Sequence, residues 1–200
     1  MEPIKVAKAA DFFATLNGAQ PAIAQSAELW PEAKLMRPLR AYLEGAFRRG
    51  LNLPSDGIVI VQDTSAKGLW ARPDFILVSA MRFKFMPGAQ VDVHSFELKT
   101  EKDARCSRFT KPWLTHFGHL VWHLPERSKS EARLAEIEDH CAGHGIGLIR
   151  MRDPSTKKGC EILADPVRKP TLTMTIEGFL ETRLSDEQKS ILARAVNGHL

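Results

Sequence analysis

Hydrophobic residues recur along the middle of the chain in two patterns, one typical of helices and one typical of strands. Leu35, Leu39 and Leu43 recur at helical spacing, followed by Ala46 and Phe47. This spacing predicts an amphipathic helix over residues 32–49. The preceding Pro31 suits a helix start and the following Gly50 suits its end.

Three strand patterns follow this helix. "GIVIVQD" begins at residue 57, "LWARPDFILVSAMRFKF" at residue 69 and "QVDVHSFELKT" at residue 90. Their β-branched and aromatic residues favour strands, and the "MPGA" between the last two marks a turn. We expect a short buried strand and then two strands in a hairpin-like arrangement.

The next segments alternate between helix and strand. Residues 102–117 are expected to be helical, although Pro112 opposes this, and "HLVWHLP" is a strand ended by Pro125. Residues 128–143 have serines at the start and glycines at the end of a helical pattern, and "IGLIRM" is a last buried strand. The order α-β-β-β-α-β-α-β predicts an α/β fold, with a central mixed sheet of four to five strands flanked by helices.

The two ends of the chain carry no recognisable motif. We expect residues 1–28 to form an N-terminal extension with a short helix near residues 9–16, and residues 29–152 to form the core. Residues 153–200 contain a loop with at most one strand, then two helices, the second capped by Ser185. We expect these C-terminal elements to pack on the core.

Composition narrows the class of protein. The 200 residues are 44% hydrophobic and 26% charged, which is typical of one globular domain. No apolar run approaches the roughly 20 residues of a membrane span, and no signal peptide is recognisable. Three widely spaced cysteines fit reduced thiols in the cytoplasm. The net charge of +4 permits a polyanionic partner without requiring one.

Charged residues interrupt the most strand-like part of the sequence. Asp74 precedes "FILV", and Glu97 and Lys99 stand in "FELKT". A buried sheet accommodates such residues only if they are paired or bind a ligand. They are therefore either strand-end charges in water or parts of a site.

Together these residues resemble the signature of the PD-(D/E)xK nucleases, the restriction-endonuclease-like superfamily. The motif stands as Pro73-Asp74 followed by Glu97-Leu98-Lys99, and the element order matches that family's core over about 120 of the 200 residues. The resemblance implies a restriction-endonuclease-like fold and a Mg²⁺-dependent nuclease that hydrolyses phosphodiester bonds in DNA. Small members of the superfamily act in restriction, repair or mobile-element defence.

The resemblance also implies a role for each motif residue. Asp74, Glu97 and the backbone carbonyl of Leu98 would bind Mg²⁺, for which Mn²⁺ can substitute. Mg²⁺ prefers a few carboxylate oxygens and keeps waters of its own. Lys99 would orient the attacking water and stabilise developing negative charge. Residues 97 and 99 are two apart, so their side chains project from the same face of a strand, as these two roles require.

The position of Asp74 depends on the hairpin loop. If Pro87-Gly88 were a two-residue turn, strict pairing would set Asp74 opposite Glu101 and not Glu97. The hairpin must then have a longer loop or a bulge, or Glu101 takes part in the site.

The family often adds a glutamate from the first helix, and two are available. At 100° per residue, Glu32 falls about 60° from Leu35 on the apolar side, whereas Glu44 projects about 180° away. We therefore expect Glu32 to assist catalysis, with Glu44 as the alternative. Glu32 could equally be a first-turn acid favoured by the helix dipole.

Basic residues follow the motif. Arg105, Arg108 and Lys111 stand at near-helical spacing and are expected to contact a phosphate backbone, although a solvated helix face explains them almost as well. With so few additional elements, sequence specificity would come from a homodimer, from a partner protein, or be absent.

Other functional classes remain open. A protein with the same fold could be catalytically silent and bind nucleic acid or a protein partner. Two sets of residues have side chains that zinc prefers, but no paired CxxC or HExxH accompanies them: His116, His119, His123 and His140, Cys141, His144. The sequence does not separate DNA from RNA or endonuclease from exonuclease action.

Overall fold

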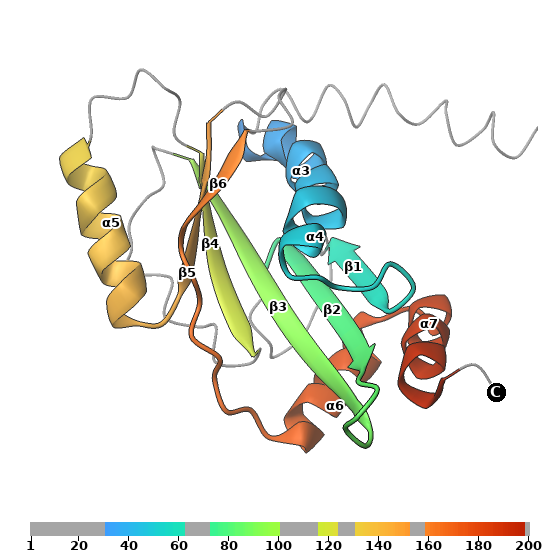
Figure 1. Ribbon diagram of the computed structural model, residues 1–200. Coiled ribbons are helices and arrows are strands. Elements are labelled where there is room, and N and C mark those ends of the chain that lie inside the picture. Colours follow the sequence, from blue (N-terminus) through green and yellow to red (C-terminus); the bar gives the residue numbers. More distant parts are fainter. Residues whose placement is uncertain (1–30, 63–72, 101–115, 124–130, 153–158, 199–200) are drawn as a thin grey trace, which may run out of the picture.

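The computed structural model describes residues 31–62, 73–100, 116–123, 131–152 and 159–198. Its centre is a mixed six-stranded sheet in which the spatial order follows the chain order (Figure 1). The strands are β1 (Ile58–Gln62), β2 (Phe75–Arg82), β3 (Ala89–Thr100), β4 (Phe117–His123), β5 (Gly147–Met151) and β6 (Cys160–Ala164). β1 to β3 are antiparallel, β3 to β5 are parallel, and β6 runs antiparallel to β5. The α/β class and the flanking helices are as predicted.

The sheet is larger than the four to five strands that we predicted. β6 is the additional strand and occupies the edge beside β5. Its residues are partly or fully exposed, so the stretch "CEILA" carries no run of buried side chains. An edge strand flanked by Gly159 and Pro166 gives little signal in a sequence, because it is identified mainly by its pairing with β5.

The register of the β2–β3 hairpin decides where Asp74 lies. The observed pairs run from Arg82 with Ala89 to Phe75 with Phe96. The loop therefore contains residues 83–88 and is longer than a two-residue turn. Continuing this register by one residue sets Asp74 opposite Glu97, so the longer-loop alternative is the one found.

One face of the sheet is covered by a continuous helical segment at residues 31–50. It consists of α3 (Pro31–Tyr42), a π-helical turn η1 (Leu43–Phe47) and α4 (Arg48–Gly50), close to the predicted bounds. The buried side chains are Leu35, Leu39, Leu43 and Phe47, which pack on β2 to β5. Ala46, expected on this side, is exposed. Leu43 and Phe47 are four residues apart and stay on one side through the π turn, as i and i+4 residues do in an α-helix.

The opposite face is covered by two separate helical units. α5 (Glu131–Gly143) packs on β4 and β5 through Ile137 and Cys141. α6 (Thr173–Arg183) and α7 (Asp186–Asn197) pack on β1, β2 and β3, with Phe179 and Leu192 buried. The Ser185 cap of α7 is confirmed, since its side chain accepts a hydrogen bond from the Gln188 N–H. Within the described segments, no helix is long and apolar enough to cross a membrane.

Gly57 allows β1 to approach β2 closely. The Ala80 N–H donates to the Gly57 carbonyl at 2.8 Å, and a Cβ at position 57 would lie 2.3 Å from the Ala80 carbonyl oxygen. Gly57→Ala is therefore expected to lower the free energy of unfolding by about 1–3 kcal/mol, because the backbone must shift. Urea denaturation would measure this effect.

Gly178→Ala is the matched control for this prediction. Nothing lies within 4 Å of a Cβ at position 178, which is inside α6. The control should raise the free energy of unfolding by about 0.5–1 kcal/mol through the higher helix propensity of Ala. If Gly57→Ala and the native protein unfold at the same urea concentration, the close approach does not limit the packing of β1.

Candidate functional site

Asp74, Glu97 and Lys99 leave the sheet on the same face. Residues directly opposed in an antiparallel pair project to one side, which groups Asp74 with Glu97. Leu98 is fully buried in the core beneath α3, so its two neighbours Glu97 and Lys99 project to the other face. The hairpin therefore brings together the three side chains that the sequence singled out.

Glu97 and Lys99 form an ion pair. The Lys99 Nζ lies 2.8 Å from the Glu97 Oε1, and their side chains are 21% and 36% exposed, respectively. Partial burial strengthens such a pair relative to a surface pair, because less water screens it. The ammonium group is thus held beside a carboxylate at the end of β3.

Asp74 is half-buried, like the other two residues. Its Oδ2 accepts a hydrogen bond from the Leu98 N–H at 2.6 Å. Burial raises the pKa of the Asp74 carboxyl, while the Leu98 hydrogen bond and the positive charge of Lys99 act in the opposite direction. The ionised form of a carboxyl group that is shielded from water in this way is stabilised by a cation that binds beside it.

The backbone carbonyl of Leu98 faces the same side as Asp74. In an antiparallel pair, the N–H and C=O of one residue point to the same neighbouring strand. The Leu98 N–H points to Asp74, so its C=O points that way too. Extending the register two residues beyond its last pair, Phe75 with Phe96, would set Pro73 opposite Leu98, and Pro73 has no N–H to donate. Position 73 thus supplies no ladder hydrogen bond to the carbonyl that we expected to bind a metal.

These groups fit a magnesium ion better than a closed zinc site. Two carboxylates and a carbonyl are oxygen ligands, and Mg²⁺ commonly takes one or two protein carboxylates and completes its shell with water. Across the residues that the structure describes, no three His, Cys, Asp or Glu side chains converge. Asp74, Glu97 and the Leu98 carbonyl would therefore be the protein ligands, and water would supply the rest.

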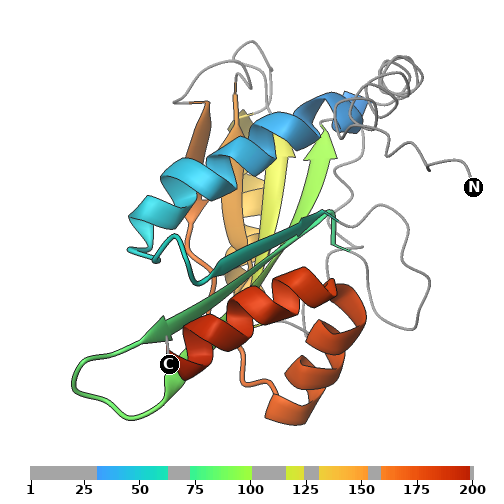
Figure 2. The same cartoon turned by 90° about the vertical axis from the view of Figure 1, so that its right-hand side faces the viewer.

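Of the two candidate glutamates of the first helix, the structure describes the side chain of one. Glu44 is exposed and pairs with Arg40, with 2.8 Å between Oε1 and Nε. The backbone of Glu32 lies in the first turn of α3, but its side chain is outside the described residues. Figure 2 shows that this turn lies near the carboxyl ends of β3 and β4, on the face of the sheet opposite to the one from which Lys99 projects. The choice of Glu32 stays a prediction.

Three predicted phosphate contacts are not placed. Arg105, Arg108 and Lys111 lie outside the described residues, as does Glu101. The predicted helix at residues 102–117 falls largely on the same segment. These assignments therefore rest on the sequence alone.

The histidines of the first candidate zinc set have separate partners. His116 accepts a hydrogen bond from the Val93 N–H, and His123 contacts the Met151 carbonyl. His119 Nε2 lies 3.1 Å from His94 Nδ1. In the second set, His144 Nδ1 contacts the His140 carbonyl. The rings of His116, His119, His123 and His144 thus each have a local hydrogen-bond partner.

Sequence reasoning missed the buried pair His94 and His119. Each is 5% exposed, and the edge of the Phe47 ring contacts both imidazoles. Burial lowers the pKa of His94 to about 4 and that of His119 well below its usual value. Both rings are neutral and lie in the core. The sequence indicated this burial only through spacing, since each histidine stands two residues before a buried apolar residue of its strand, Phe96 or Val121.

This pair predicts a dependence of stability on pH. Unfolded histidine protonates near pH 6.5, whereas folded His94 resists protonation down to about pH 4. The free energy of unfolding should therefore be highest above pH 6.5 and fall by up to about 3 kcal/mol as the pH is lowered towards 4. Urea denaturation at several pH values measures this. His144→Gln, which changes an exposed histidine, should keep the slope; a native protein without a slope in this window would contradict the account.

Comparison with known proteins adds little to this site. No family model matches the chain, and no curated protein matches it. A solved structure of a protein of unknown function from Silicibacter pomeroyi is similar at 16% identity, with a TM-score of 0.40. The similarity covers 76% of this chain and 87% of that one. A likeness of this degree carries no argument about function.

Proposed function

We propose that this chain is a metal-dependent nuclease of the PD-(D/E)xK type that hydrolyses phosphodiester bonds in DNA. The observation that carries the proposal is the β2–β3 register, which opposes Asp74 to Glu97 and leaves Lys99 paired at the same strand end. The position of Asp74 in the sequence did not require this. A different loop length would have separated the two acids.

The fold supports the same proposal. A helix, three antiparallel strands, and a fourth strand parallel to the third occur in the order expected for that superfamily's core. The first helix packs on one face of the sheet and α5 on the other. The site lies at the end of the hairpin.

Each residue of the site would have a separate task. Asp74, Glu97 and the Leu98 carbonyl would hold Mg²⁺ or Mn²⁺, which when bound neutralises phosphate charge and acidifies water. Lys99 would donate a hydrogen bond to the attacking water and stabilise negative charge that develops on the phosphate. Burial of Asp74 keeps competing water away from its oxygens.

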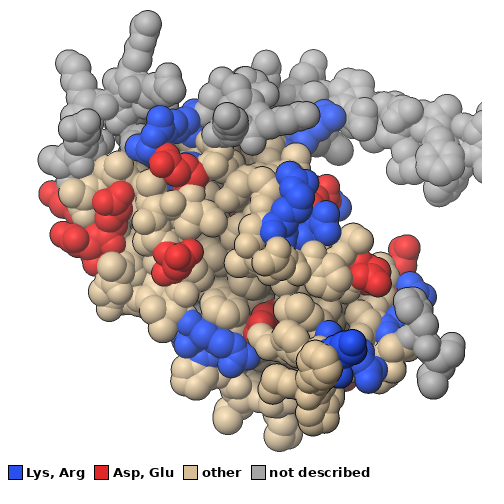
Figure 3. Space-filling model, viewed as in Figure 1, with Lys and Arg blue, Asp and Glu red and all other residues tan. Residues whose placement is uncertain are grey.

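Surface charge favours some approaches of DNA over others. α5 presents Glu136, Glu138 and Asp139, which form an acidic surface at the left of Figure 3. Basic side chains gather over α3, where Lys34 and Arg37 are exposed. DNA phosphates would therefore lie away from α5, and Arg105, Arg108 and Lys111 are expected to add contacts.

A panel of substrates would test the proposal. Supercoiled plasmid, linear duplex, single-stranded DNA and RNA are incubated with the protein in Mg²⁺, Mn²⁺ or EDTA. We expect metal-dependent cutting of DNA that Glu97→Gln removes and that Glu161→Gln, a change on the edge strand β6, leaves intact. Binding without cutting in either metal would favour the catalytically silent alternative, and cutting of RNA alone would change the substrate class.

A further inference from the structure

The loop of the β2–β3 hairpin exposes an unusual amount of apolar surface. Phe85 is 87% exposed, Met86 is 66% exposed and Phe83 is 42% exposed. In Figure 2 the loop extends beyond the sheet next to the end of α7. Three large apolar side chains within four residues at the tip of a hairpin indicate a surface that is covered by a partner. We call residues 83–88 the hairpin tip.

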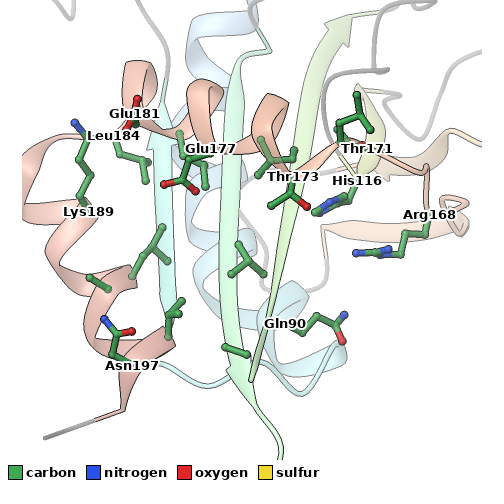
Figure 4. Close-up of a pocket in the computed structure, with 18 of the residues that line it drawn as sticks. Gln90, His116, Arg168, Thr171, Thr173, Glu177, Glu181, Leu184, Lys189 and Asn197 are labelled. Carbon is green, nitrogen blue, oxygen red and sulfur yellow. The ribbon is translucent and has the colours of Figure 1, made fainter. Parts of the chain in front are cut away.

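An apolar groove lies directly beside the base of this hairpin. It has a volume of about 1010 Å³ and is bounded by α6, α7 and residues 89–91 of β3. Figure 4 shows Glu177 and Glu181 along α6, Lys189 and Asn197 along α7, and Gln90 on β3. The apolar lining consists of Val91, Ile176, Leu180, Leu184, Leu192 and Val196. A groove of this size accommodates two or three large side chains.

The charges of the tip and the groove are complementary. Within the described residues, Arg168 is paired with Asp92 and Lys189 with Asp186, whereas no ion pair involves Glu177 or Glu181. The tip carries Lys84, whose Nζ lies 5.2 Å from the centre of the Phe85 ring. The groove thus offers negative charge, and the tip offers positive charge next to its apolar side chains.

The distances allow each copy to bind the other in the same way. The tip extends three residues beyond the Arg82–Ala89 pair, or about 10 Å at ~3.3 Å per residue. The groove begins at Ala89, the β3 member of this pair, and continues away from the tip over Gln90 and Val91. Two hairpins laid antiparallel about a two-fold axis therefore bring each tip over the groove of the other copy, which is the self-complementary arrangement of a symmetric dimer.

We propose that two copies of this chain form a symmetric dimer in which Phe85 and Met86 of one copy enter the α6–α7 groove of the other. Lys84 then lies near Glu177 and Glu181 across the interface. This inference goes beyond the proposed nuclease function and does not depend on it. The tip and the Asp74 site are at opposite ends of the hairpin, so the dimer leaves the Asp74 site of each copy accessible.

Sedimentation velocity of the full chain over a broad range of concentrations tests the dimer. We expect the native protein to sediment as a dimer and Phe85→Ser/Met86→Ser to dissociate about ten-thousandfold more readily, because the symmetric interface loses four buried side chains, two from each copy, and each contributes roughly a tenfold factor. Val167→Ser is the matched control, since Val167 is 62% exposed and lines neither surface. Circular dichroism verifies that each variant is folded.

A charge exchange tests the orientation. Lys84→Glu and Glu181→Lys should each weaken association by about threefold to tenfold, and the double variant should restore much of the loss. A native protein that is monomeric at every concentration would overturn the proposal. So would a dimer that is unchanged by Phe85→Ser/Met86→Ser, or a double charge variant that is weaker than both single variants. None of these results depends on DNA cleavage, so they leave the proposed function to its own test.

Discussion

Replacing Lys99 with Ala is expected to lower the rate of metal-dependent DNA cleavage by about a hundredfold to a thousandfold. The Lys99 ammonium lies 2.8 Å from Glu97 and is the basic group of the motif that the structure places at the site. Without it, the attacking water and the developing negative charge lose a hydrogen-bond donor. Single-turnover cleavage of a labelled duplex measures the rate of the chemical step directly.

Arg152→Ala is the control for Lys99→Ala. It also removes an ion pair with a glutamate, at 3.0 Å from Glu161, but Arg152 directly follows β5, two strands away from β3. It should cleave at the native rate. Native cleavage by folded Lys99→Ala would show that the active site lies elsewhere.

Asp74→Asn should abolish cleavage without weakening the fold. Burial raises the pKa of Asp74, so its ionised form is less favourable in the folded chain than in the unfolded chain. Stability therefore decreases as the pH rises through this raised pKa, and a neutral side chain avoids the loss. The amide oxygen of Asn can still accept the Leu98 N–H. We expect cleavage to fall at least about a hundredfold and the free energy of unfolding at neutral pH to be equal or higher.

Asp92→Asn should behave in the opposite way. Asp92 is also a partly buried acid on the hairpin, but it pairs with Arg168 at 3.1 Å and lies 3.5 Å from His116. Its replacement should lower stability and leave cleavage unchanged. Cleavage and urea denaturation of both variants give the comparison. If Asp74→Asn is markedly destabilised and still cleaves DNA, then Asp74 is a structural residue.

Strong periodic signals made most of the fold predictable. The four-residue spacing of Leu35, Leu39 and Leu43, between a proline and a glycine, gave the first helical segment almost to the residue. Buried runs in β2, β3 and β5 likewise gave their strands. In each case, the spacing of apolar residues that predicts the element also places the side chains whose burial stabilises it.

Features that depend on pairing between distant segments were not predictable in the same way. The loop at residues 83–88 contains Pro87-Gly88, and the sequence left three alternatives there: a longer loop, a bulge, or a tight turn with Glu101 in the site. The register was set by burial of Phe75 against Phe96 on one face. β6, the His94–His119 pair and the groove beneath α6 exist only once the sheet has formed.

The candidate site was predictable because its residue types conflict with their surroundings. Asp74, Glu97 and Lys99 interrupt apolar strands, and the structure brings them to one face of one strand end. The side chains of Glu32 and of the basic residues after Thr100 lie outside the described residues, and their roles stay predictions.

The most direct test of the central claim is a time course of supercoiled plasmid cleavage in Mg²⁺ or Mn²⁺. Native protein, Lys99→Ala and Asp74→Asn are purified in parallel, with EDTA as the blank. The account predicts nicked or linear product from the native protein only, and only with metal. No cleavage by the native protein in either metal, or equal cleavage by all three proteins, would contradict it.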